Sequence, residues 1–215
     1  MTKSATTGQL MIGGRAAAIV LALWIAYTAI YTAPLSDAGH AAFEFVPGLL
    51  AVAVLWWAGY RNGNWYLRAG PLSRPGLAAL ALVLLVLPVV ILPVAVEGQW
   101  VGFDPLTTLV FPLASGVAQE LFFRGALLPV SIRLCGGRPM RGVVLQAVLF
   151  GLWHAPKAYL GTPADMSPWV GAIALSVVPF LGGLGWGWQV QRDRTIVWAT
   201  GEHVIFLTIM SLFGM

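Results

Sequence analysis

The chain has 215 residues, of which 59% are hydrophobic and only 9% charged, and its mean hydropathy is +0.82. Soluble domains carry roughly 25% charged residues, so this composition excludes an ordinary soluble protein and predicts one that crosses a membrane several times. The net charge of +4 does not indicate a nucleic-acid partner, because the basic residues lie mostly at the ends of apolar runs and form no continuous patch.

Seven apolar runs each approach the roughly 20 residues that cross a bilayer core. They are residues 15–34, 43–60, 77–96, 106–132, 141–160, 168–190 and 195–214. Each is expected to be a helix, because lipid offers backbone groups no hydrogen-bond partner and none of the runs alternates like a barrel strand. We therefore expect an all-α, polytopic helical bundle that forms a single membrane domain over residues 1–215.

The charges between the runs predict how the chain is oriented. Basic residues precede the first run and follow the second, fourth and sixth, whereas the gaps after the first and third are acidic and the fifth gap is mixed. Because positively charged loops stay in the cytoplasm, this pattern predicts a cell-membrane protein with a cytoplasmic amino terminus and an external carboxyl terminus. The first run exceeds the roughly 7–15 apolar residues of a signal peptide, so it is expected to be a retained anchor.

The fourth run contains the most informative stretch of the chain. Between Leu106 and Val130 its only ionisable residues are Glu120 and Arg124, which are one helical turn apart. In a membrane helix both would lie roughly 13–20 Å from the cytoplasmic end, at about 1.5 Å per residue. Ionisable groups at that depth are costly, face the protein interior and usually mark a working site.

Two of the three histidines, His154 and His203, also fall inside predicted helices. At about 1.5 Å per residue, both would reach the depth of Glu120. A carboxylate in a low-dielectric pocket could take a proton from water, while imidazoles could protonate a leaving amine or stabilise an oxyanion. The set therefore predicts hydrolysis. The structural alternative is an ion pair between Glu120 and Arg124, with histidines that bond only to buried backbone groups.

Three segments, in this order, resemble the signature of the CAAX-protease and bacteriocin-processing family of intramembrane endopeptidases, also called the abortive-infection family. The family pattern is E-E-x-x-x-R, then F-x-x-x-H, then H-x-x-x-N. The corresponding segments here run from Gln119 to Arg124, from Phe150 to His154 and from His203 to Leu207. The resemblance covers about residues 104–210. It implies a protease-like core there, which cleaves a peptide or protein substrate within the lipid bilayer.

Two positions depart from the family pattern. The first glutamate, to which the family's water-activating role is assigned, is Gln119 here, and the last asparagine is Leu207. Glutamine cannot act as a general base. In order of preference, Glu120 activates water with Gln119 as a polar wall of the site; or catalysis is lost and the protein is a scaffold that binds a peptide or partner; or Glu202 supplies the carboxylate. Glu202 is ranked last because adjacent helix positions, such as 202 and 203, do not share a face.

The resemblance implies a reaction without a required metal, so we expect no cofactor. A zinc site formed by His154, His203 and Glu120 is the minority alternative, since two histidines and a carboxylate suit catalytic zinc. The sequence lacks the H-E-x-x-H helix of zinc proteases, which argues against it. A small transporter would also bury charges at mid-membrane, but it should show paired broken helices in both halves, and the sequence shows none. The oligomeric state is not predicted.

Overall fold

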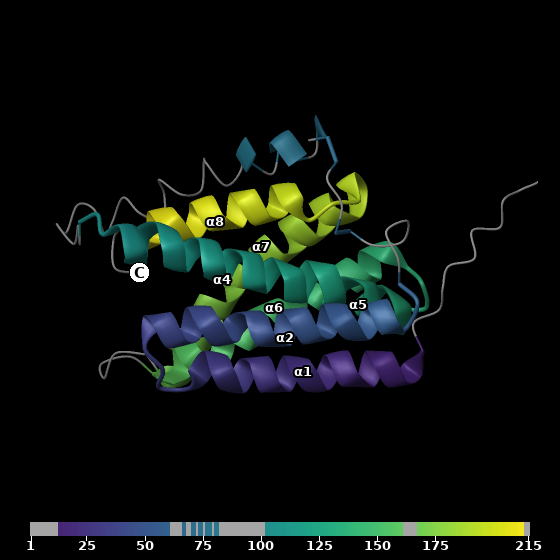
Figure 1. The fold of residues 1–215 in the computed structure, drawn as a ribbon, viewed down its shortest axis with the longest axis horizontal. Coiled ribbons are helices and arrows are strands. Elements are labelled where there is room, and N and C mark those ends of the chain that lie inside the picture. The colour runs from purple at the N-terminus through teal and green to yellow at the C-terminus, as the bar shows by residue number, and fades with distance from the viewer. Residues whose placement is uncertain are drawn as a thin grey trace, which may run out of the picture.

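The computed structural model describes residues 13–60, 102–160 and 167–212, together with short pieces between residues 66 and 81. Every secondary-structure element in these residues is a helix (Figure 1), so the prediction of an all-α protein is confirmed for the described part of the chain. Six of the seven predicted spans coincide with helices. The remaining one, residues 77–96, lies mostly outside the described residues.

The fourth predicted span is one continuous helix of changing width, Leu106–Leu134. The elements are α1 (Gly14–Thr32), α2 (Asp37–Trp57), η1 (Leu106–Val110), α4 (Phe111–Glu120), η2 (Leu121–Leu127), α5 (Leu128–Leu134), α6 (Pro139–Leu160), α7 (Pro168–Asp193) and α8 (Val197–Ser211). The two η elements are π-helical, which means that they are wider than the α-helices on either side.

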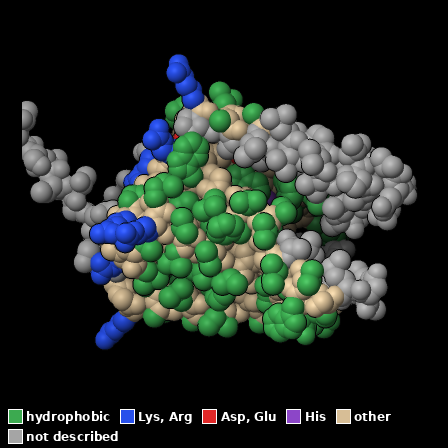
Figure 2. Space-filling view, turned by 180° about the vertical axis from the view of Figure 1, so that it is seen from behind, with side chains coloured by type: hydrophobic (Ala, Val, Ile, Leu, Met, Phe, Trp, Pro, Cys, Tyr) green, Lys and Arg blue, Asp and Glu red, His purple; other side chains and the backbone are tan. Residues whose placement is uncertain are grey.

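Three of the described helices are long and apolar enough to cross a membrane: Gly14–Thr32, Leu106–Leu134 and Pro168–Asp193. A shorter apolar helix spans Ala42–Trp57. The expected total of seven transmembrane helices is therefore not confirmed. Figure 2 shows a largely hydrophobic face with basic side chains gathered at one end. An apolar surface of this kind suits contact with lipid, so the protein is a membrane protein.

The bundle is held together by close helix contacts. α6 and α7 make the most extensive pairing, and the glycines of α7 make it possible. A Cβ atom at Gly183 would lie 3.0 Å from Cα of Ala147, and one at Gly187 would lie 2.8 Å from Oε1 of Gln146. The glycine-rich segment of α7 therefore serves close helix packing.

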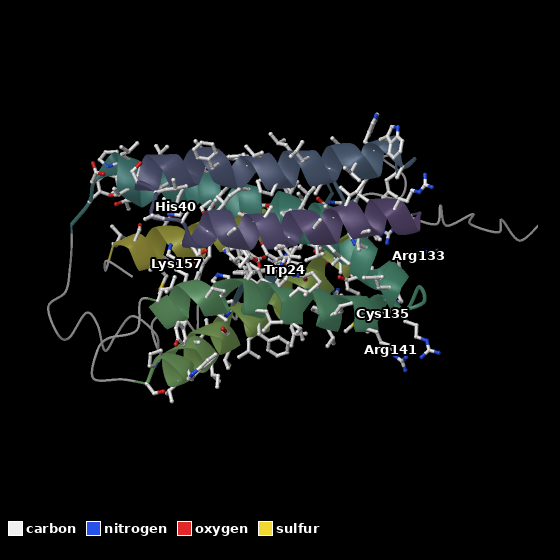
Figure 3. The ribbon with its side chains drawn as sticks, turned by 90° about the horizontal axis from the view of Figure 1, so that it is seen from below. Trp24, His40, Arg133, Cys135, Arg141 and Lys157 are labelled. Atoms are coloured by element: carbon white, nitrogen blue, oxygen red, sulfur yellow. The ribbon has the colours of Figure 1, made fainter. Side chains whose placement is uncertain are left out.

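α1 lies against both α2 and α6. At its middle, Nε1 of Trp24 donates a hydrogen bond to the carbonyl oxygen of Leu149, 3.2 Å away in α6 (Figure 3). α4 packs between α2 and α8, and η2 packs against α2. The middle of the long helix is therefore enclosed by its neighbours, and the polar residues of that stretch are buried.

Two helix boundaries follow from local chemistry. The long helix starts where the carboxylate of Asp104 accepts hydrogen bonds from the backbone and hydroxyl of Thr107, each 2.9 Å long. These bonds hold the pKa of Asp104 below its usual range. At the other end, Gly136 and Gly137 adopt φ angles of 67° and 76°, which most residues avoid, and so turn the chain from α5 into α6.

Candidate active site

Glu120, Arg124 and His203 form a buried cluster where the long helix meets α8. Oε1 of Glu120 lies 2.8 Å from an Arg124 guanidinium nitrogen and 2.8 Å from Nδ1 of His203. Glu120 and Arg124 are 0% exposed, and His203 is 3% exposed. The contact with Arg124 is short but lacks the geometry of a hydrogen bond, so that pairing is electrostatic. The structure brings these three residues together at one carboxylate oxygen.

The helix changes width at this carboxylate. Glu120 is the last residue of α4, and Arg124 lies in the π-helical stretch η2, which begins at Leu121. π-Helical turns are rare and are frequently found at functional sites. The change of helix type directly after Glu120 is therefore a second indication, independent of the charges, of a functional site at this position.

Aromatic rings enclose the charged groups. The guanidinium carbon of Arg124 lies 4.4 Å from the centroid of the Phe150 ring and 5.4 Å from that of Trp186. Trp186 stacks on His203 with centroids 4.4 Å apart and an interplanar angle of 24°. Arginine over an aromatic face is stabilised by the negative potential of the ring, so these contacts hold the buried cation in place.

His154 lies beside the cluster and not within it. Its Nδ1 is 2.9 Å from the carbonyl oxygen of Phe150, and its ring meets the Phe150 ring edge-on at 4.8 Å. The same Phe150 ring lies 6.0 Å from the ring of His203. Among the described residues no hydrogen bond joins His154 to Glu120. Both histidines therefore border Phe150, and only His203 touches the carboxylate.

Two residues next to the site, Glu44 and Ser115, were not singled out from the sequence. Oγ of Ser115 donates a hydrogen bond to Oε2 of Glu44 at 2.6 Å, and Nε2 of Gln119 donates to Oγ of Ser115 at 2.8 Å. Glu44 is 3% exposed and Gln119 is 4% exposed. Little signal was available, because Glu44 is only the second residue of the apolar run 43–60, where a carboxylate is less costly than at mid-membrane.

Glu202, the third candidate for the catalytic carboxylate, faces α7. Its Oε1 accepts a hydrogen bond from Nε2 of Gln189 at 2.8 Å, while His203, the next residue, turns to Glu120. Leu207, one turn further along α8, is half-buried. Glu202 and His203 thus contact different helices, as neighbouring helix positions should.

The described residues contain no group of three histidine, cysteine, aspartate or glutamate side chains that could hold a metal ion. The three ligands of the zinc alternative therefore do not converge in this part of the chain.

Comparison with known proteins agrees with the motifs. Residues 100–209, just over half of the chain, match the family model described as type II CAAX prenyl endopeptidase, Rce1-like. The matched region includes all three signature segments, from Gln119 to Leu207. No curated protein and no solved structure matches the chain. The resemblance inferred from the sequence is confirmed, and the chain belongs to the Rce1-like family of type II CAAX prenyl endopeptidases.

Proposed function

We propose that the protein is an intramembrane endopeptidase of the cell membrane, which hydrolyses a peptide bond of a membrane-associated peptide or protein with water activated by Glu120. Membership of a protease family supports proteolysis in general. The observation that carries the assignment is the asymmetry of the Glu120 carboxylate. Its Oε1 is held by Arg124 and His203, whereas its buried Oε2 has no hydrogen-bond partner in the described part of the chain.

In the proposed reaction, the oxygen of a water molecule attacks the carbonyl carbon of the scissile bond while Oε2 of Glu120 takes one water proton. A C–O bond forms, and the π electrons of the carbonyl move to its oxygen to give a tetrahedral oxyanion. The C–N bond then breaks as the carbonyl reforms, and the proton held by Glu120 passes to the leaving nitrogen. The products are a new carboxyl terminus and a free amine.

The other residues of the cluster would support this step. Arg124 orients Glu120 and balances its negative charge in the buried site. Nδ1 of His203 donates to Glu120 and Nδ1 of His154 donates to a carbonyl oxygen, because neither partner can donate. A protonated ring at either position would present Nε2–H, which can stabilise the oxyanion or protonate the leaving group.

The experiment compares purified wild type with the Glu120→Gln variant in liposomes that contain quenched-fluorescent peptides. The panel includes prenylated CAAX peptides, which the family description suggests, and their unprenylated counterparts. Glu120→Gln should abolish cleavage without preventing insertion. Ser176→Ala is the matched control, since in the described residues the Ser176 hydroxyl bonds only to the carbonyl oxygen of Ala172 within α7. Normal cleavage by Glu120→Gln would overturn the assignment of Glu120 as the residue that activates water. If only Glu202→Gln lost cleavage, that role would belong to Glu202.

The second candidate is a relative that binds a peptide or partner without cutting it. Gln119 favours it, because the residue at the family's water-activating position cannot take a proton. The Gln119→Glu substitution distinguishes the two proposals. Cleavage by this variant, together with a wild type that cleaves none of the peptides, would establish the non-cleaving candidate. Cleavage by the wild type would exclude it.

A further inference from the structure

The amide of Gln119 has different surroundings on its two sides. Its Nε2 donates to Oγ of Ser115 at 2.8 Å. Its Oε1 is also buried but has no hydrogen-bond partner among the residues that the structure describes. A buried polar atom without a partner is costly, and in a native site it usually meets water or a ligand.

Glu44 determines which way the Gln119 amide is oriented, although two hydrogen bonds, through Ser115, separate the two side chains. An ionised carboxylate can only accept hydrogen bonds, so the single hydroxyl proton of Ser115 is directed to Oε2 of Glu44, 2.6 Å away. The Ser115 oxygen must then accept from Gln119. This requirement fixes Nε2 of Gln119 on the Ser115 side and presents Oε1 on the opposite side.

Gln119 and Glu120 are consecutive buried residues at the end of α4. The hydroxyl of Tyr27 is also buried without a hydrogen-bond partner in the described residues. Its ring packs edge-on against Phe122, with centroids 5.2 Å apart, in the helix that carries Gln119 and Glu120. Oε1 of Gln119 and Oε2 of Glu120 both lack a hydrogen-bond partner in the described part of the chain, so one water molecule between them would satisfy both.

We propose that Glu44 is a positioning residue, which acts through Ser115 to orient Gln119 so that Oε1 accepts a hydrogen bond from the water that Glu120 activates. This inference rests on the proposed function. An amide oxygen can hold and orient water without taking its proton. Position 119 thus keeps the acceptor part of the family glutamate's role, and Glu120 supplies the proton acceptance.

The first test uses Glu44→Gln, which keeps the size of the side chain but adds an NH₂ donor. The new NH₂ group can donate to the Ser115 oxygen, and the Ser115 hydroxyl can then donate to Oε1 of Gln119. The Gln119 amide would turn over, so that its own NH₂ group and not its oxygen would face the water. We expect kcat to fall about tenfold or more, the effect of a lost hydrogen bond, while KM is unchanged. Ser115→Ala should cause a similar loss, and the control Ser176→Ala should not.

The decisive test repeats Glu44→Gln in a Gln119→Glu background. Both oxygens of a carboxylate accept, so the substituted side chain would not need to be oriented, and Glu44→Gln should change kcat less than about twofold there. A merely structural role of Glu44 would lower kcat equally in both backgrounds. Thermal unfolding in detergent is measured for each variant, so that a folding defect is separated from a change in turnover.

Three results would overturn the positioning role: a wild-type kcat in Glu44→Gln, a wild-type kcat in Ser115→Ala, or an equal loss in both backgrounds. Each leaves the proposed function intact if Glu120→Gln still abolishes cleavage in the same assay. A wild type that cleaves none of the prenylated or unprenylated peptides would instead overturn the proposed function, and the positioning role with it.

Discussion

The guanidinium carbon of Arg124 lies 4.4 Å from the centroid of the Phe150 ring, so an aromatic face and a carboxylate together hold the buried cation of the site. The same ring lies 4.8 Å from His154 and 6.0 Å from His203. One side chain of α6 therefore contacts three of the four residues proposed for catalysis. Phe150 is as much a part of the site as the residues that it supports.

Replacing this ring should damage both stability and turnover. Phe150→Leu removes the cation–π contact with Arg124 and leaves a partly empty space, so the free energy of unfolding should fall by roughly 1–3 kcal/mol. Denaturant titration in detergent micelles measures this change, and the peptide assay measures kcat. Phe103→Leu is the control, because Phe103 is 60% exposed. An unchanged stability of Phe150→Leu would contradict the role given to the ring.

The effects of removing the two charges of the buried Glu120–Arg124 ion pair on stability should not be additive. Arg124→Met leaves the Glu120 charge without its cation in a site that is 0% exposed, which should cost roughly 3–5 kcal/mol of unfolding free energy. The double variant Glu120→Gln with Arg124→Met removes both charges and should recover much of that loss. Cleavage should remain absent in the double variant. A double variant that regains cleavage would show that the pair is only structural.

The position of His203 depends on a close contact between α4 and α8. A Cβ atom at Gly116 would lie 2.7 Å from Cγ2 of Val204, the residue after His203. Gly116→Val should push α8 away from Glu120 and lower kcat by roughly tenfold to a hundredfold. Gly201→Val, where an added Cβ meets nothing within 4 Å, is the matched control. Equal kcat values for the two variants would contradict this dependence.

The start of the long helix should respond to acid. The pKa of Asp104 is lowered from 3.8 by its hydrogen bonds to Thr107, so the ionised carboxylate stabilises the folded state above pH 3.8. That contribution is lost as the pH falls through the lowered pKa of the folded state. Thermal unfolding between neutral pH and about pH 3 should show this loss in the wild type and a smaller one in Asp104→Asn, which retains an acceptor oxygen. Identical pH profiles would exclude a role for the carboxylate charge.

The orientation of the protein can be tested at its single cysteine. Figure 3 shows Cys135 with Arg133 and Arg141 at one end of the molecule, and Lys157 towards the other. Because the basic end should face the cytoplasm, a membrane-impermeant maleimide should label Cys135 in inverted vesicles and not in intact cells. A Lys157→Cys variant in a Cys135→Ser background should show the opposite pattern. Reversed labelling of both would invert the proposed topology.

The depth of a side chain along its helix could be predicted from the sequence, whereas the side of the helix on which it lies could not. Counting residues from the charged ends placed Glu120, His154 and His203 in one layer, and the structure puts Glu120 and His203 in contact. His154, in the same layer, bonds to its own helix. The rotation of each helix depends on contacts between distant segments, which a single hydrophobic pattern does not encode. The contact between Glu44 and Ser115, which are 71 residues apart, was missed for that reason.

The π-helical stretch η2 begins immediately after Glu120. Such a stretch accommodates one residue more than an α-helix of the same path, and each residue of an α-helix turns the chain by about 100°. Deletion of one codon at Leu121 would let the backbone relax to the narrower α-helix along the same path, so α5 would keep its direction, but Glu120 and Arg124 would be three positions apart instead of four. The widened turn therefore sets the spacing within the charged pair and not the direction of the helix that follows.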